Sequence, residues 1–139
     1  MIVLDTNVVS EPLRPAPDAR VMAWLDAQDP RTLYLTTVSL AELLVGMAYL
    51  PEGRRRSELE GGLATALGQL FGDRLLPFDV AAASAFAPMM ARARAQGVQV
   101  GMADGEIAAT AAAHGFWVAT RDVGPFRATG VGVIDPWGA

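Results

Sequence analysis

Ile2-Val3-Leu4-Asp5-Thr6-Asn7 is the stretch on which the fold class depends, because it places an acid directly after a short apolar run. The apolar residues, two of them β-branched, favour a buried strand, and the polar residues after them are suited to end it and to cap a helix or turn. In parallel α/β sheets, functional side chains gather just beyond the carboxyl ends of the strands. Asp5 is therefore the first candidate for a functional residue.

Further along the chain, short apolar runs alternate with longer stretches of helical periodicity. Further strands are expected over 33–36, 75–78, 117–119 and 131–134, and helices over 18–28, 38–50, 52–71, 80–96 and 102–114. Parallel neighbours in a sheet need crossover connections, which are usually helices. The alternation therefore predicts an α/β protein, a three-layer α/β/α sandwich with a mainly parallel central sheet. The length predicts one domain over residues 1–139.

The composition excludes several kinds of chemistry. All 11 basic residues are arginine, and the chain has one histidine and no cysteine. The lack of lysine excludes Schiff-base and P-loop enzymes, and the lack of thiols and further histidines excludes the usual zinc sites. Any bound metal must therefore be held by oxygen. A net charge of −4 also gives no broad positive field for nucleic acid, so action on RNA would need acids gathered at a metal site with arginines around it.

The chain shows no targeting or membrane-spanning segment. The first apolar run stops at Asp5, far short of a signal peptide. The longest apolar stretch, residues 80–91, contains Pro88 and stops at Arg92, well below the roughly 18 apolar residues that a span needs. We therefore expect a cytoplasmic protein with no membrane attachment.

Four acids from remote segments are expected to meet at one end of the sheet. Two follow expected strands and two lie in the first turns of expected helices: Asp5, Asp122, Glu42 and Asp104. Like charges about 4 Å apart repel by about 4 kcal/mol at an effective dielectric of about 20, so such a cluster destabilises the fold unless a cation binds. One or two Mg²⁺ or Mn²⁺ ions fit oxygen ligands and can support phosphodiester hydrolysis without histidine, cysteine or lysine.

The order, spacing and flanking residues of these acids resemble those of the PIN-domain nucleases, from near the first residue to near the last. The matching segments are IVLDTN (2–7), TVSLAELLVG (37–46), DGEIAATA (104–111) with His114-Gly115, and ATRD (119–122) with Phe126. A single one of these motifs would be a weak signal, whereas the ordered set is specific.

The resemblance implies a VapC-type toxin of a type II toxin-antitoxin pair, a metal-dependent endoribonuclease that cleaves structured RNA such as tRNA or rRNA. It implies metal-ligating roles for the acids and supporting roles for two neighbours: Asp5, Glu42, Asp104 and Asp122, with Asn7 and Thr120. It also implies a homodimer bound by a VapB-like antitoxin, with DNA contacted only through that antitoxin. Two positions depart from the family pattern, since Gly101 stands where many relatives have proline and Asp122 where many have asparagine.

Each acid also has a purely structural interpretation. Asp5 can cap the turn after its strand, Asp104 can be an acid favoured by a helix dipole, and Asp122 can be a turn residue. Glu42 is harder to explain this way, because it lies in a markedly apolar segment. Glu106 lies about 200° around the helix from Asp104 and is expected to face elsewhere.

Other residues and functions have weaker support. His114, at a helix end, is given no catalytic role, and the run Arg54-Arg55-Arg56 is expected to be a solvated helix face rather than an RNA grip. The alternative function is an antitoxin-binding module that acts mainly in operon autoregulation. A phosphatase with an aspartate nucleophile is disfavoured, because Asn7 replaces its second aspartate and lysine is missing.

Overall fold

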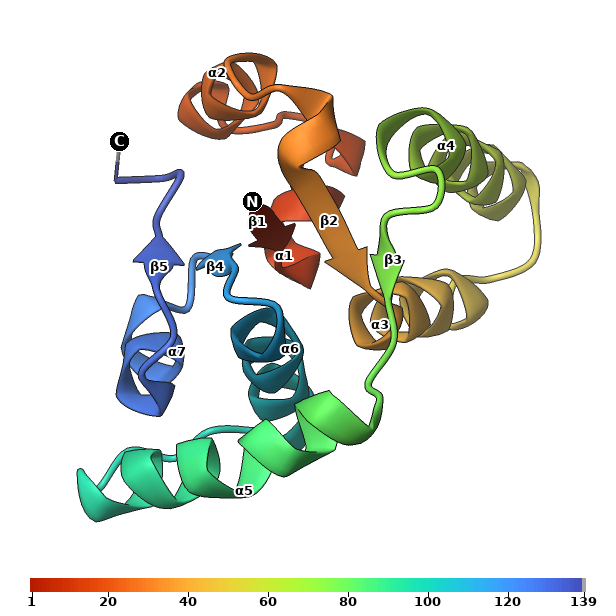
Figure 1. Cartoon of the computed structure of the whole chain (residues 1–139). Coiled ribbons are helices and arrows are strands. Elements are labelled where there is room, and N and C mark those ends of the chain that lie inside the picture. Colours follow the sequence, from red (N-terminus) through yellow and green to blue (C-terminus); the bar gives the residue numbers. More distant parts are fainter. Residues whose placement is uncertain (139) are drawn as a thin grey trace.

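A five-stranded parallel sheet forms the centre of the computed structural model, which describes residues 1–138 (Figure 1). The strands are β1 (Ile2–Leu4), β2 (Leu33–Thr36), β3 (Leu75–Leu76), β4 (Trp117–Ala119) and β5 (Val133–Ile134). Their order is β3-β2-β1-β4-β5, and every neighbouring pair is parallel. The strands β2 and β3 thus extend the sheet on one side of β1, and β4 and β5 extend it on the other side.

Helices cover both faces of the sheet (Figure 1). They are α1 (Thr6–Ser10), α2 (Ala19–Asp26), α3 (Thr37–Ala48), α4 (Arg54–Leu70), α5 (Val80–Ala95), α6 (Met102–Ala113) and α7 (Val123–Thr129), with the 3-10 turns η1 (Glu11–Leu13) and η2 (Pro30–Thr32). The predicted three-layer α/β/α sandwich with a parallel sheet is confirmed. Ala139, the last residue of the expected domain, lies outside the described residues.

Two apolar clusters lie on the two faces of the sheet, because successive strand residues point to opposite sides. Leu4 on β1 belongs to a cluster with residues of α1, α2 and α4, including Val8. The preceding residue, Val3, belongs to the other cluster, with Ile107 of α6 and Phe126 of α7. Burial on both faces explains why the strands read as continuous apolar runs.

Capping side chains set where the helices begin. Asp79 accepts a hydrogen bond from the backbone N–H of Ala82 at 3.0 Å and so forms the N-cap of α5. Thr36 caps α3 in the same way, through a 3.0 Å bond from the N–H of Ser39. Because α3 starts directly after β2, Glu42 lies in its second turn, near the carboxyl end of the sheet.

The structure differs from the expected elements mainly where segments are short. The expected strands 75–78 and 131–134 are reduced to two residues each, and α1 and α7 were not among the expected helices. These helices have 5 and 7 residues, too few for apolar periodicity to be visible in the sequence. Within residues 1–138, no helix is long and apolar enough to cross a membrane.

Candidate acidic active site

All four acids predicted from the sequence line one open hollow of about 280 Å³, here called the acid hollow. Its lining residues are Asp5, Thr6, Asn7, Ser10, Glu42, Asp104 and Asp122. It lies where the order of the strands reverses around β1, the crevice in which open α/β sheets bind ligands. The fold therefore brings together residues from the start, the middle and the end of the chain.

Asp5 is the buried member of the set, with 3% of its surface exposed. Its Oδ1 accepts a hydrogen bond of 2.7 Å from the backbone N–H of Thr6, which makes Asp5 the N-cap of α1. Its Oδ2 accepts a second bond of 2.7 Å from the hydroxyl of Thr120. Two donors thus fix the carboxylate, and the capping interpretation and the functional one are both compatible with this geometry.

Glu42 approaches the acid hollow from α3 and is held by a threonine. The hydroxyl of Thr6 donates a 2.7 Å hydrogen bond to Oε1 of Glu42 and lies 3.0 Å from the hydroxyl of Ser39. Neither hydroxyl was assigned a role from the sequence. The sequence signal that could have identified Thr6 is its place between Asp5 and Asn7, directly after the first expected strand.

The surroundings of Glu42 differ from those expected. Its apolar neighbours in the sequence argued against a solvated acid, but Glu42 is exposed and its neighbour Leu44 is 53% exposed. The helix α3 presents part of its apolar surface to solvent, so apolar neighbours in the sequence do not imply burial here. The feature that distinguishes Glu42 is its bond to Thr6.

The two residues predicted to support the acids do contact them. The amide of Asn7 donates to Oδ2 of Asp122 at 3.4 Å, and its carbonyl oxygen accepts from the backbone N–H of Arg121 at the same distance. The hydroxyl of Thr120 donates to Asp5 and accepts from the N–H of Asp122 at 2.9 Å. Thr120 and Asn7 therefore tie the residues after β4 to those after β1.

Burial and mutual repulsion perturb two of the acids. Burial raises the pKa of Asp5 from 3.8 to about 6, with smaller contributions from the charges of Asp104 and Asp122. The hydrogen bonds from Thr120 and Thr6 act on this pKa in the opposite direction. Burial also raises the pKa of Asp104, and the charges of Asp122 and Glu42 raise it further. A cation in the acid hollow would relieve this repulsion.

The donor set of the acid hollow fits a hard divalent cation. The side chains that line it offer carboxylate, hydroxyl and amide oxygens as metal ligands. Carboxylate oxygens are the ligands that Mg²⁺ and Mn²⁺ prefer. Within residues 1–138, however, no three acidic, histidine or cysteine side chains already converge closely enough to enclose an ion. Asp5 is fixed by its bonds, so convergence would depend on the exposed Glu42 and Asp122.

Residues that were given no chemical role lie outside the acid hollow. Its lining does not include Glu106 or His114, and the His114 ring stacks on Phe116 with ring centroids 5.4 Å apart. Arg54 and Arg56 form exposed ion pairs one helical turn ahead, with Glu58 and Glu60. These pairs are typical of a solvated helix face.

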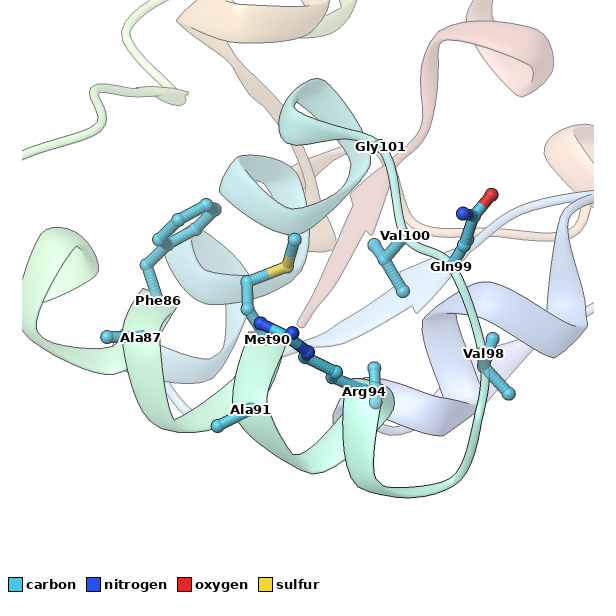
Figure 2. Close-up of a pocket in the computed structure, with 10 residues that line it drawn as sticks. Phe86, Ala87, Met90, Ala91, Arg94, Val98, Gln99, Val100 and Gly101 are labelled. Carbon is cyan, nitrogen blue, oxygen red and sulfur yellow. The ribbon is translucent and has the colours of Figure 1, made fainter.

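A larger hollow of about 890 Å³ lies between α5 and the segment that leads to α6 (Figure 2). Its lining residues are Phe86, Ala87, Met90, Ala91, Ala93, Arg94, Val98, Gln99, Val100 and Gly101. None of these is acidic, and Arg94 is the charged member of the set. Its size therefore does not make it a rival to the acid hollow as a metal site.

Comparison with known proteins gives close relatives over the whole chain. The PIN domain family matches residues 2–131. The plasmid stability protein StbB of Pseudomonas syringae pv. tomato is 50% identical over 139 residues, 100% of both chains. A VapC ribonuclease of Sinorhizobium fredii is 50% identical over 137 residues, 99% of this chain and 98% of the relative. Toxin FitB of Neisseria gonorrhoeae is 46% identical over 137 residues, 99% of each chain.

Solved structures give the same result. The crystal structure of FitAcB from Neisseria gonorrhoeae matches with a TM-score of 0.94 at 45% identity, covering 100% of both chains. A structure of FitAB bound to a DNA fragment matches with a TM-score of 0.94 at 44% identity, covering 99% of this chain and 96% of that chain. A member of the VapBC family of toxin-antitoxin systems from Mycobacterium tuberculosis matches with a TM-score of 0.65 at 29% identity, covering 86% and 83%.

The fold is a parallel α/β sandwich with acids at the switch point of its sheet, and the PIN domain family matches residues 2–131. The chain therefore belongs to the PIN-domain family. Within that family it is of the VapC type, the group that contains the VapC ribonuclease and toxin FitB relatives. The resemblance shown by the sequence motifs is thereby confirmed.

Proposed function

We infer that this protein is a metal-dependent endoribonuclease, the toxin of a VapBC-type toxin-antitoxin pair, and that residues 1–139 form one nuclease domain. The observation that carries this inference is that acids from four remote segments line one hollow at the switch point of the sheet. The VapC ribonuclease relative, 50% identical, supports the reaction class. The substrate class we propose is structured RNA, either tRNA or rRNA.

In the proposed mechanism, Asp5, Glu42, Asp104 and Asp122 are the residues that would hold Mg²⁺ or Mn²⁺, as one or two ions. Such an ion supplies Lewis acidity toward a phosphate oxygen and lowers the pKa of a water molecule. The protein's part is to fix the carboxylates. The bonds from the Thr6 N–H and from the hydroxyl of Thr120 orient the carboxylate of Asp5 and favour its charged form.

The hydroxyl of Thr6 has the corresponding role for Glu42. It holds Oε1 at 2.7 Å and leaves the second oxygen of that carboxylate without a hydrogen-bond partner among the described residues. Asn7 restrains Asp122 through a longer contact of 3.4 Å. Cleavage by an activated water is expected to leave 5′-phosphate and 3′-hydroxyl ends.

The proposed partners are a VapB-like antitoxin and a second copy of the chain, with DNA contacted only through the antitoxin. Support comes from the match to a toxin-antitoxin complex and from the FitAB structure bound to a DNA fragment. The same DNA-bound structure favours a second candidate function, a binding module that acts mainly in operon autoregulation with little catalysis of its own. That function does not require an intact acid hollow.

The test is to incubate purified, antitoxin-free protein with total bacterial RNA in Mn²⁺, in Mg²⁺ and in EDTA, and to map every new 5′ end. Asp5→Asn removes a charge from the acid hollow, while Glu106→Gln removes one from the same molecule outside it. We expect discrete cuts that require metal, vanish in Asp5→Asn and persist in Glu106→Gln. Absence of cuts from protein that binds Mn²⁺ would favour the regulatory binding module.

A further inference from the structure

Arg121 lies in the chain between two residues of the acidic site. It follows Thr120, which bonds to Asp5, and precedes Asp122, which lines the hollow. Its backbone N–H donates to Oδ1 of Asn7 at 3.4 Å. The residue is exposed and has no ion-pair partner within residues 1–138.

The guanidinium of Arg121 lies over an aromatic ring. Its Cζ is 5.3 Å from the ring centroid of Trp137. Trp137 is 6% exposed and packs in the apolar cluster around Leu4 and Val8. A guanidinium stacked on a buried ring keeps its N–H donors available at its edge, while cation–π attraction holds it in place.

Most other arginines are already engaged or lie elsewhere. Five form ion pairs with acids close in sequence: Arg14, Arg20, Arg31, Arg54 and Arg56. Arg74 donates to the backbone carbonyl oxygens of Leu33 and Leu70. No basic residue lines the acid hollow itself. Arg121 thus carries a positive charge on the residue directly before Asp122 of the acid hollow, whose acids would otherwise repel a polyanion.

We propose that Arg121 binds a phosphate of the RNA strand next to the bond that is cut, with Trp137 as the platform that orients its guanidinium. This assignment rests on the proposed function, since it presupposes that RNA crosses the acid hollow. The planar guanidinium can donate two parallel hydrogen bonds to a phosphate, which a lysine cannot reproduce. Arg121 is therefore a positioning residue for the substrate and does not act on the reacting atoms.

The rival interpretation is that Arg121 only fastens the C-terminal segment through Trp137. Salt dependence separates the two roles, because each phosphate contact releases counterions. The logarithm of the binding constant falls with the logarithm of salt concentration by about 0.7 for each phosphate neutralised on a single strand. A structural clamp would change the melting temperature without changing this slope.

The experiment measures binding of a fluorescein-labelled single-stranded RNA of mixed sequence over a series of NaCl concentrations in Mg²⁺. The protein carries Asp104→Asn in every case, so that the probe is not cut. Arg121→Gln and Arg121→Lys are compared with a control variant, Arg31→Gln. The control makes the same change in net charge as Arg121→Gln, but at an exposed residue of η2, before β2 begins. The melting temperature of each variant is recorded, and the variants are also made with Asp104 intact for the total-RNA cleavage assay.

We expect Arg121→Gln to weaken binding by about ten-fold and to reduce the salt slope by about 0.7. Arg121→Lys should keep the slope and bind more weakly than the parent, and Arg31→Gln should match the parent. An unchanged salt slope in Arg121→Gln overturns the proposal for Arg121, whether or not this variant melts at a lower temperature. In that case, RNA cleavage by the parent with Asp104 intact would still support the nuclease function. A parent that neither binds the probe nor cuts RNA overturns both.

Discussion

The hydroxyl of Thr120 donates a hydrogen bond to Oδ2 of Asp5 at 2.7 Å and so links residues that are 115 positions apart in the chain. The bond crosses from the end of β4 to the end of β1, the neighbouring strands at the switch point. It favours the charged form of a carboxylate whose burial favours the neutral form. One hydroxyl therefore keeps the most deeply buried acid of the hollow available to a cation.

Replacing that hydroxyl should shift the pH dependence of metal binding. In Thr120→Val, Asp5 loses a donor, so its pKa should rise above about 6 and Mn²⁺ binding should require a higher pH. The free energy of unfolding should also fall by about 1–3 kcal/mol, because the N–H of Asp122 loses its acceptor too. Calorimetric titration with Mn²⁺ over a pH series measures the shift, and Thr120→Ser should behave as the parent. Equal pH midpoints for Thr120→Val and the parent would contradict the assignment.

The raised pKa of Asp5 also predicts an unusual stability profile for the metal-free protein. A folded-state pKa of about 6 against 3.8 means that the folded protein binds the proton more tightly than the unfolded chain does. Stability from this group is therefore present at low pH and is lost as the pH rises from about 4 to about 7, by about 3 kcal/mol in total. Urea unfolding in EDTA, compared with Asp5→Asn at each pH, isolates the effect. A constant difference between the two proteins across this range would disprove it.

Asp104 offers a second test of electrostatic strain. It has no side-chain hydrogen bond among the described residues, and Gly101 is the N-cap of α6, so Asp104 is not needed as a cap. Asp104→Asn should therefore raise the melting temperature of the metal-free protein or leave it unchanged, while abolishing stabilisation by Mn²⁺. Thermal melts with and without Mn²⁺ measure both effects. Glu106→Gln, on the same helix, should retain the stabilisation, and a large loss of stability in metal-free Asp104→Asn would mark it as structural.

The sequence predicted much of the fold because its signals are local. β2 and β4 match the expected ranges, and Gly97 and Gly115 adopt positive φ of 73° and 70° after α5 and α6, as the end of each helix requires. The predicted helix over 52–71 also forms, despite its glycines, as α4. The glycines in its interior meet open space, so their cost is limited to their own backbone freedom.

The details of the site depend on packing between remote segments, which a sequence shows only indirectly. Acids after strands could be placed at one edge of the sheet from topology alone. The bond between Thr6 and Glu42, 36 residues apart, depends on how α1 lies against α3, and α1 itself was too short to be recognised. The exposure of Glu42 follows from the same packing, because α3 buries Leu43 and leaves Leu44 at the surface.

Close approach of α5 to α6 should depend on Gly105, the residue next to Asp104. A Cβ at this position would lie 2.5 Å from Sδ of Met90 and 2.9 Å from Cε2 of Phe86. Because both atoms are at the ends of side chains, Gly105→Ala should be accommodated by displacing α5 side chains, at a cost of about 1–3 kcal/mol in the free energy of unfolding. Any part of the strain that these side chains do not absorb should shift the start of α6 and reduce the affinity for Mn²⁺, since Asp104 is the neighbouring residue. Gly61→Ala on α4, where the new Cβ meets nothing within 4 Å, should instead stabilise the protein by about 0.5–1 kcal/mol. Urea unfolding and Mn²⁺ titration of both variants test this, and equal stability of Gly105→Ala and Gly61→Ala would show that the glycine is not required for the packing of α5 on α6.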